Sequence, residues 1–125
     1  MPIDSVTAVP IGRELDERFA NAQKWIGRRE YCLVRIADEA GTTGVGGAAP
    51  AAHYGETADT VAAVLPALLD AVERVGDPHA IGEIEAELKG VVNGNPAARC
   101  ALSIAVHDLA AKRLGVPLYR LWGLY

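Results

Sequence analysis

Hydrophobic positions in the first half of the chain follow the patterns of β-strands. Residues 31–36 (YCLVRI) are rich in strand-forming side chains and are bounded by charged residues, which predicts a strand. Residues 3–10 alternate loosely between apolar and polar positions, and residues 42–49 follow a turn at 38–41, so both predict further strands. The three glycines of the last strand are expected to weaken it or to admit a bulge. Residues 12–29 are too long for a hairpin turn and are expected to form a loop.

The second half of the chain carries the start and stop signals of helices. Thr57 is a capping residue for a first helix, and Pro66 is expected to kink or restart that helix. Two further helices are predicted to begin where a capping residue precedes a proline, at Asp77-Pro78 and at Asn95-Pro96. Gly115 ends the last helix. Strands followed by helices predict an α+β fold, in which a three-stranded antiparallel meander packs one face against a bundle of about three helices.

The last predicted helix, residues 97–114, is almost entirely apolar apart from one narrow stripe. The stripe repeats every four residues and consists of Arg99, Ser103 and His107. Asp108 and Lys112 add an ion pair at the same spacing. Because a surface helix normally has a wider polar face, this helix is predicted to be buried by its own sheet and by a surface outside this chain. The alternative is an alanine-rich helix packed tightly within a three-helix layer.

Composition and charge narrow the class of protein. With 125 residues, half of them hydrophobic, the chain is long enough for one domain with its own core. A net charge of -4, a pI of 5.3 and the lack of a basic run argue against nucleic acid as a partner. No membrane span and no signal peptide are recognisable, so a cytoplasmic protein is expected. Cys32 and Cys100 lie in apolar segments and are expected to be buried free thiols, with a disulfide as the alternative.

The sequence contains no catalytic constellation. The glycine-rich residues 41–47 are followed by Ala-Ala-Pro rather than by the Lys-Ser or Lys-Thr of a phosphate-binding loop, so they predict a hairpin. Neither a metal-ligand spacing nor a nucleophile setting is present among the histidines, serines and cysteines. No catalytic and no metal-binding residue is therefore expected. His53 stands beside Tyr54 in a loop and is a candidate binding residue, although a solvated loop histidine needs no function.

Five segments carry a recognisable order: residues 31–36, 44–50 (GVGGAAP), 54–57 (YGET), 97–112 and 115–123. In this order they resemble the N-terminal domain of the mandelate racemase and muconate lactonizing enzyme family, in the enolase superfamily. Each segment is modest alone, but the ordered set spans almost the whole chain. The resemblance implies an enolase N-terminal domain-like fold.

The same resemblance implies a two-domain enzyme. Residues 1–115 would form a capping domain, and residues 116–125 would start the linker to a (β/α) barrel. In the family, the barrel holds Mg²⁺ on acidic side chains, and a lysine or histidine base removes the proton α to a substrate carboxylate. The barrel and its base are missing from this chain, so it is expected to bind no metal itself and to be inactive without its barrel.

The expected function is thus a capping, substrate-specificity domain of a racemase, epimerase, cycloisomerase or dehydratase, with a slight preference for the muconate or dipeptide-epimerase side. Expected partners are the C-terminal barrel, a small carboxylate substrate and, through exposed apolar surface, further copies of the chain. Nucleic acid and membranes are not expected partners. The alternative function is a free-standing small-molecule binding or protein-interaction module without catalysis.

The resemblance also implies that two loops close over the barrel mouth. By position these are residues 16–26 and 50–56. The candidate substrate-facing residues in them are Phe19, Trp25, Ile26, His53 and Tyr54. Alternatively, the aromatic residues of the first loop merely anchor it. Gly47 and Ser103 stand where many relatives carry an acid, which puts in doubt a hairpin-to-loop contact and a polar contact of the last helix.

Overall fold

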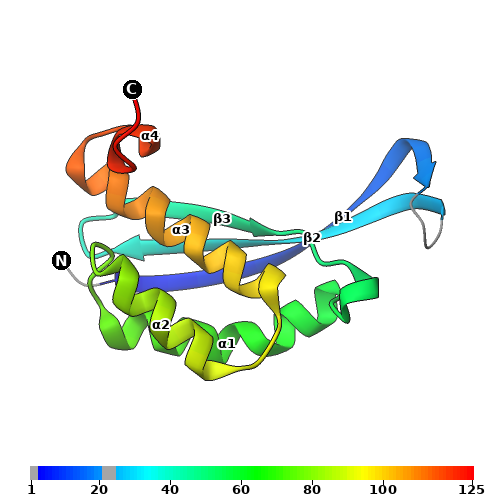
Figure 1. The fold of residues 1–125 in the computed structure, drawn as a ribbon, viewed down its shortest axis with the longest axis horizontal. Coiled ribbons are helices and arrows are strands. Elements are labelled where there is room, and N and C mark those ends of the chain that lie inside the picture. Colours follow the sequence, from blue (N-terminus) through cyan, green and yellow to red (C-terminus); the bar gives the residue numbers. More distant parts are fainter. Residues whose placement is uncertain (1–2, 21–24) are drawn as a thin grey trace.

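The structure is a computed structural model, and it describes residues 3–20 and 25–125. Its elements are the strands β1 (Ile3–Ala20), β2 (Trp25–Asp38) and β3 (Thr43–Ala48), the 3₁₀ helix η1 (Ala52–Tyr54), and the helices α1 (Ala58–Val75), α2 (Ile81–Val91), α3 (Pro96–Leu114) and α4 (Leu118–Leu121). The strands form an antiparallel sheet in the order β1-β2-β3, and the helices lie against one of its faces (Figure 1). The predicted α+β fold is confirmed.

β1 and β2 continue beyond the helices as a two-stranded arm, residues 12–20 and 25–30 (Figure 1). Their pairing extends from Glu14 opposite Arg28 to Ala20 opposite Trp25, with one irregularity in between. The expected loop over residues 12–29 is therefore wrong. Most of the described side chains of the arm are exposed, so the alternation that marks a half-buried strand is missing from its sequence.

The hydrophobic core lies between the sheet and the helices. Alternate residues of β2 point into it, and Cys32, Val34 and Ile36 are fully buried. The largest buried side chains that the helices contribute are Leu65, Leu68, Ile84, Leu88, Leu102 and Leu109. These residues belong to one hydrophobic cluster, so the sheet and helices α1 to α3 share a core.

Two glycines of β3 allow α3 to approach the sheet closely. A Cβ at Gly44 would overlap the carbonyl oxygen of Ala105, and a Cβ at Gly46 would overlap that of Ala101. β3 pairs with β2 residue by residue from Thr43 to Ala48, so the expected bulge is absent. The glycines serve helix–sheet packing instead, because a side chain at either position would collide with the backbone of α3.

Most of the apolar surface of α3 is buried inside this chain. Its buried residues are Ala98, Ala101, Leu102, Ala105, Val106, Leu109, Ala110 and Ala111. They pack against β3, β2, α1 and α2. Ile104 and Leu114 remain exposed, at 43% and 55%. The alternative of a tightly packed alanine-rich helix thus explains most of α3, and a covering surface outside this chain stays a prediction.

The expected start of α1 after Thr57 is confirmed. Thr57 and Thr60 form a reciprocal capping box, in which each hydroxyl accepts a hydrogen bond from the other residue's backbone N–H, at 2.8 and 3.2 Å. α1 does not restart at Pro66 but continues through it. Pro66 is exposed, so water can satisfy the carbonyl group that loses its N–H donor.

α2 starts later than predicted, at Ile81 rather than at Pro78. The Asp77 carboxylate accepts a hydrogen bond from the His79 backbone N–H at 2.9 Å, and the Asp77 carbonyl accepts one from Ala80 at 3.0 Å. These two bonds close a separate turn in front of the helix. The capping residue was thus correctly recognised as a turn former, but the prediction that it starts the helix is wrong.

The start and end of α3 are confirmed, with Pro96 at its first position and Gly115 closing it at a φ of 68°. Both cysteines are free, as predicted. Cys32 is buried, and burial raises the pKa of its thiol. The expectation that Cys100 is buried is wrong, because it lies on the exposed side of α3. Among the residues described, no helix has the length and apolarity needed to cross a bilayer.

Candidate functional site

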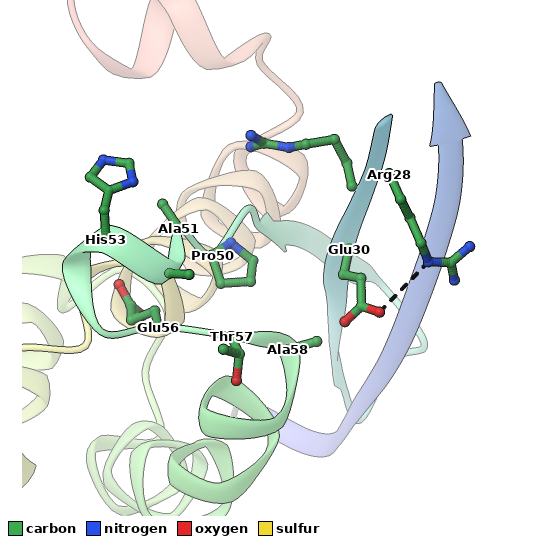
Figure 2. A pocket seen from close by; sticks show the side chains of 10 residues that line it. Arg28, Glu30, Pro50, Ala51, His53, Glu56, Thr57 and Ala58 are labelled. Atoms are coloured by element: carbon green, nitrogen blue, oxygen red, sulfur yellow. Dashed lines mark ion pairs between the residues drawn. The ribbon is translucent and has the colours of Figure 1, made fainter. Parts of the chain in front are cut away.

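A cavity of about 210 Å³ lies where the arm meets the segment that links β3 to α1 (Figure 2). Arg28, Arg29 and Glu30 of β2 line one side. The other side is formed by Pro50, Ala51, Ala52, His53, Glu56, Thr57 and Ala58. The fold therefore brings the arm and the predicted second loop, residues 50–56, to one site.

The arm side of the cavity carries charge. The Arg28 guanidinium donates a hydrogen bond to Glu14 at 2.7 Å, and its Nε lies 3.8 Å from a Glu30 carboxylate oxygen. The hydrogen bond to Glu14 raises the pKa of Arg28 above its usual value. Arg29 adds a second cation, whose Cζ lies 6.0 Å from the centre of the Tyr31 ring. Two guanidinium groups face two carboxylates here, and both carboxylates contact Arg28, so Arg29 is the cation of this side that suits an anionic group of a ligand.

The loop side of the cavity is a compact turn that carries His53 and Tyr54. Backbone N–H groups of Tyr54 and Gly55 donate to the carbonyl oxygens of Ala51 and Ala52, both at 2.9 Å. Gly55 has a φ of 79°, a conformation that favours glycine. The rings of His53 and Tyr54 lie 4.2 Å apart, and Tyr54 is 74% exposed. Of the two candidates on this loop, His53 lines the cavity, while Tyr54 stands outside its lining.

Glu56, at the end of the loop, points into the interior of the domain. It is only 3% exposed, and its carboxylate accepts hydrogen bonds from the backbone N–H groups of Ala97, at 3.0 and 3.1 Å, and Ala98, at 3.4 Å. Figure 2 shows His53 on one side of η1 and Glu56 on the other. The loop that lines the cavity is thus attached directly to the first turn of α3.

The three candidates on the arm lie at its far end. Phe19 pairs with Ile26, and Trp25 pairs with Ala20, so their backbones belong to strands rather than to a loop. The side chains of Phe19, Trp25 and Ile26 lie outside the described part of the structure. Their substrate-facing role therefore stays a prediction. The cavity itself is lined by the base of the arm.

The other two histidines, His79 and His107, are engaged within the domain. Nδ1 of His107 lies 2.8 Å from the carbonyl oxygen of Ser103, and its ring meets the edge of Trp122 at 5.8 Å. His79 pairs with Asp77 at 3.3 Å. In residues 3–20 and 25–125 there is no group of three or more His, Cys, Asp or Glu side chains that could hold a metal ion.

A second hollow, of about 350 Å³, lies on the sheet face that points away from the helices. It is lined by Val9, Leu33, Val34, Arg35 and Val45. Gly47 lies on the same face, where an added Cβ would meet Leu33 at an ordinary contact distance of 3.5 Å. Glycine at position 47 therefore leaves this apolar face open, and it has no side chain with which to contact the loop.

Sequence reasoning missed Arg28, Arg29, Glu30 and Glu56. Arg28 and Arg29 end the stretch interpreted as a loop, and Glu30 lies between it and the predicted strand, where no pattern showed which side chains would face the second segment. For Glu56 one signal existed. Pro96 starts a helix whose next backbone N–H groups need acceptors, and a buried acid can supply them, but the sequence does not show which acid does so.

The structure is thus an α+β domain in which a sheet arm and a short loop meet at one cavity, beside a helix packed on glycines. The chain belongs to the mandelate racemase / muconate lactonizing enzyme, N-terminal domain family, whose sequence profile matches residues 5–123. The resemblance inferred from the five ordered segments is confirmed.

The relatives include several epimerases. The chain is 36% identical over 84 residues to an L-Ala-D/L-Glu epimerase of Bacteroides thetaiotaomicron, covering 67% of this chain and 21% of that protein. It is 32% identical over 124 residues to an L-Lys-D/L-Arg epimerase of Desulforapulum autotrophicum, covering 98% of this chain and 35% of that one.

Solved structures show the same likeness. A dipeptide epimerase from Cytophaga hutchinsonii, complexed with Mg and the dipeptide D-Ala-L-Val, matches with a TM-score of 0.92 and 28% identity over 98% of this chain and 33% of that one. A 2-chloromuconate cycloisomerase from Rhodococcus opacus matches with a TM-score of 0.90 and 25% identity over 99% of this chain and 34% of that one. The chain thus spans about a third of the length of these solved structures.

Proposed function

We propose that this chain is the capping and substrate-specificity domain of an enolase-superfamily isomerase or lyase. The observation that carries the proposal is the family match over residues 5–123, together with coverage of only about a third of full-length epimerases. In this proposal a (β/α) barrel supplies Mg²⁺ and the base that removes the α-proton of a carboxylate substrate, and the cap alone is inactive. Residues 1–115 form the cap, and residues 116–125 lead into the barrel.

For the reaction, we propose epimerisation of a dipeptide. Several of the similar proteins are epimerases whose names specify two amino acids, and a structural neighbour holds Mg together with a dipeptide. A dipeptide carries a carboxylate that the Arg28 and Arg29 side of the cavity can attract. A chloromuconate cycloisomerase at 28% identity keeps cycloisomerisation as the competing reaction.

For the site, we propose that the arm and the 50–56 loop both face the substrate. His53 lines the cavity and Tyr54 is exposed beside it, so both can reach a ligand between cap and barrel. Phe19, Trp25 and Ile26 would act from the far end of the arm. A cap that closes over a barrel mouth excludes water and selects among substrates, which matches the placement of these segments at one end of the sheet.

For partners, we propose that the C-terminal residues contact the barrel. Trp122, Leu124 and Tyr125 are 58%, 56% and 104% exposed, and Ile104 on α3 adds to the exposed apolar surface. An apolar surface of this kind would also make the isolated chain self-associate. Free thiols and an acidic composition support the cytoplasm as its compartment.

A chimera tests the proposal. Residues 1–115 of this chain would replace the matching cap of the L-Lys-D/L-Arg epimerase of Desulforapulum autotrophicum, which aligns with 98% of this chain. We expect Mg²⁺-dependent exchange of an α-proton for deuterium with at least one dipeptide, and none with the isolated chain. A folded chimera that exchanges no dipeptide, beside an active parent enzyme measured in parallel, would contradict the proposal.

A further inference from the structure

Glu56 is a buried carboxylate that none of the expected functions uses. Its relative exposure is 3%, and among the residues that the structure describes its carboxylate accepts hydrogen bonds from Ala97 and Ala98, in the first turn of α3. The residue before that helix does not cap it. Asn95 has a φ of 51°, and its side chain donates to the Asn93 carbonyl oxygen at 3.1 Å. Glu56 therefore performs the capping from 41 positions earlier in the chain.

The place of Glu56 in the loop gives this capping bond a second consequence. Its own backbone N–H donates to the Ala51 carbonyl oxygen at 3.3 Å, so residues 51–56 close on themselves. His53 and Tyr54 lie inside this closed turn, and the Glu56 side chain is its attachment to the buried part of the domain. Outside the turn, Pro50 and Thr57 connect it to β3 and α1.

We propose that Glu56 is the positioning residue of the specificity loop: it holds His53 and Tyr54 at the cavity by fixing the loop to the N-terminus of α3. This inference rests on the proposed function, in which the loop faces the substrate, and it names the group that sets the position of the loop. A helix that is packed on β3 through Gly44 and Gly46 is a rigid support. The Glu56 carboxylate connects the loop to this rigid helix, and this connection limits the movement of the loop.

Two substitutions at Glu56 separate the loss of its negative charge from the loss of the whole side chain. Glu56→Gln keeps the size of the side chain but leaves only one acceptor oxygen, and its amide group opposes the N–H groups of Ala97 and Ala98. Glu56→Ala removes the attachment completely. The matched control is Thr57→Ala, the neighbouring residue, which caps α1 through Thr60 and makes no bond to α3. All three changes weaken or remove a helix cap, but only those at Glu56 release the loop.

Amide hydrogen exchange on the complete 125-residue chain measures the release. The reporters are the amides of Tyr54 and Gly55, which are bonded inside the turn. In Glu56→Ala we expect them to exchange about tenfold faster, with a smaller increase in Glu56→Gln and no increase in Thr57→Ala beyond that of the whole chain. The proton resonances of the His53 and Tyr54 rings should also lose the shifts that their 4.2 Å contact produces.

The contrary result is equally clear. If Glu56→Ala accelerates exchange in the first turn of α3 but leaves Tyr54, Gly55 and both ring signals unchanged, Glu56 is a helix cap only and the inference is overturned. The same holds if loop and core amides accelerate equally, as in Thr57→Ala. Failure of the proposed function looks different. If the proposed function is wrong, the chimera exchanges no deuterium into dipeptides. The amide measurements on the isolated chain do not depend on that result.

Discussion

The α3–β3 layer and the arm are held in place by different forces. In the layer, backbone meets backbone: Gly46 leaves room for the carbonyl of Ala101, and Leu102 and Leu109 are fully buried behind it. In the arm, strands pair beyond the helices, and the closest described side-chain contact is the Arg28–Glu14 ion pair, whose partners are 50% and 75% exposed. Burial therefore stabilises the layer, and main-chain pairing with solvated charges stabilises the arm.

This difference suggests that the α3–β3 layer supports the fold, and that the arm and the 50–56 loop are the segments suited to recognise a ligand. A residue of the layer cannot change without moving a helix against a sheet, so the layer is a support with little freedom to vary. Apart from Glu56, the side chains of the arm and the 50–56 loop can change without disturbing the core, because most of those that the structure describes are exposed. Segments of this kind are suited to select a substrate, while the layer holds them at the cavity.

The largest effect is expected in the layer, from Gly46→Ala. The new methyl group would overlap the carbonyl oxygen of Ala101, and backbone on both sides prevents an easy shift, so we expect a loss of about 3 kcal/mol in the free energy of unfolding. Urea denaturation measures it. Gly47→Ala is the matched control on the open face of the same strand and should change stability by less than about 0.5 kcal/mol. Equal losses would remove the distinction between the two faces of β3.

A medium effect on stability is expected where side chains of α3 bond to the backbone of the edge strand β3. Asp108 accepts hydrogen bonds from the Val45 backbone N–H at 2.9 Å and from Lys112 at 2.7 Å, while Lys112 also donates to the Thr43 carbonyl. Asp108→Ala should lower the free energy of unfolding by about 1 kcal/mol. Lys112→Ala should cost less, because its contacts are more exposed. If Lys112→Ala costs more than Asp108→Ala in the same denaturation assay, the bond to Val45 is not the main link.

A smaller effect on stability is expected in the arm. Arg28→Ala removes the ion pairs with Glu14 and Glu30, but all three side chains are solvated, so thermal denaturation should show almost no change. The same substitution should weaken the binding of a dipeptide carboxylate by the chimera, seen as a higher KM. A loss of stability as large as that of Gly46→Ala would mean that the arm belongs to the folding core.

The smallest effect concerns acid stability at the turn before α2. The hydrogen bond from the His79 backbone N–H lowers the pKa of Asp77 below its ordinary 3.8. A carboxyl group whose pKa is lowered by folding stabilises the protein above its ordinary pKa and loses that contribution as the pH falls through the lowered value. Unfolding curves should therefore show a slight loss of stability below pH 3.8 that Asp77→Asn lacks. Identical acid profiles would contradict this assignment.

The sequence predicted those features that local signals specify. Thr57 marks a helix start through its hydroxyl, Pro96 and Gly115 mark helix ends through their backbone preferences, and all three were placed correctly. The strand at residues 31–36 was recognised because it is rich in strand-forming side chains, and in the structure Cys32, Val34 and Ile36 form its buried face. The ordered segments also identified the family, since their spacing carries information that no single motif holds.

The features that could not be predicted from the sequence depend on contacts between residues that are distant in the chain. None of the described side chains of the arm is buried, so its strands left no alternation to detect. Gly44 and Gly46 looked like defects of a strand until α3 was placed against them. Glu56 and the first turn of α3 are 41 positions apart, and nothing near Glu56 indicates that partner. The cavity has the same origin, because it forms only where two such segments meet.

One measurement tests the central claim, that the arm and the loop carry specificity on a rigid support. Residues 12–29 and 50–56 of this chain would be grafted into the cap of the Desulforapulum autotrophicum epimerase, and kcat/KM would be measured for a panel of dipeptides. We predict that this graft reproduces the dipeptide preference of the chimera that carries the whole cap, residues 1–115. If the whole cap changes the preference and the grafted segments do not, specificity lies elsewhere in the domain and the claim is wrong.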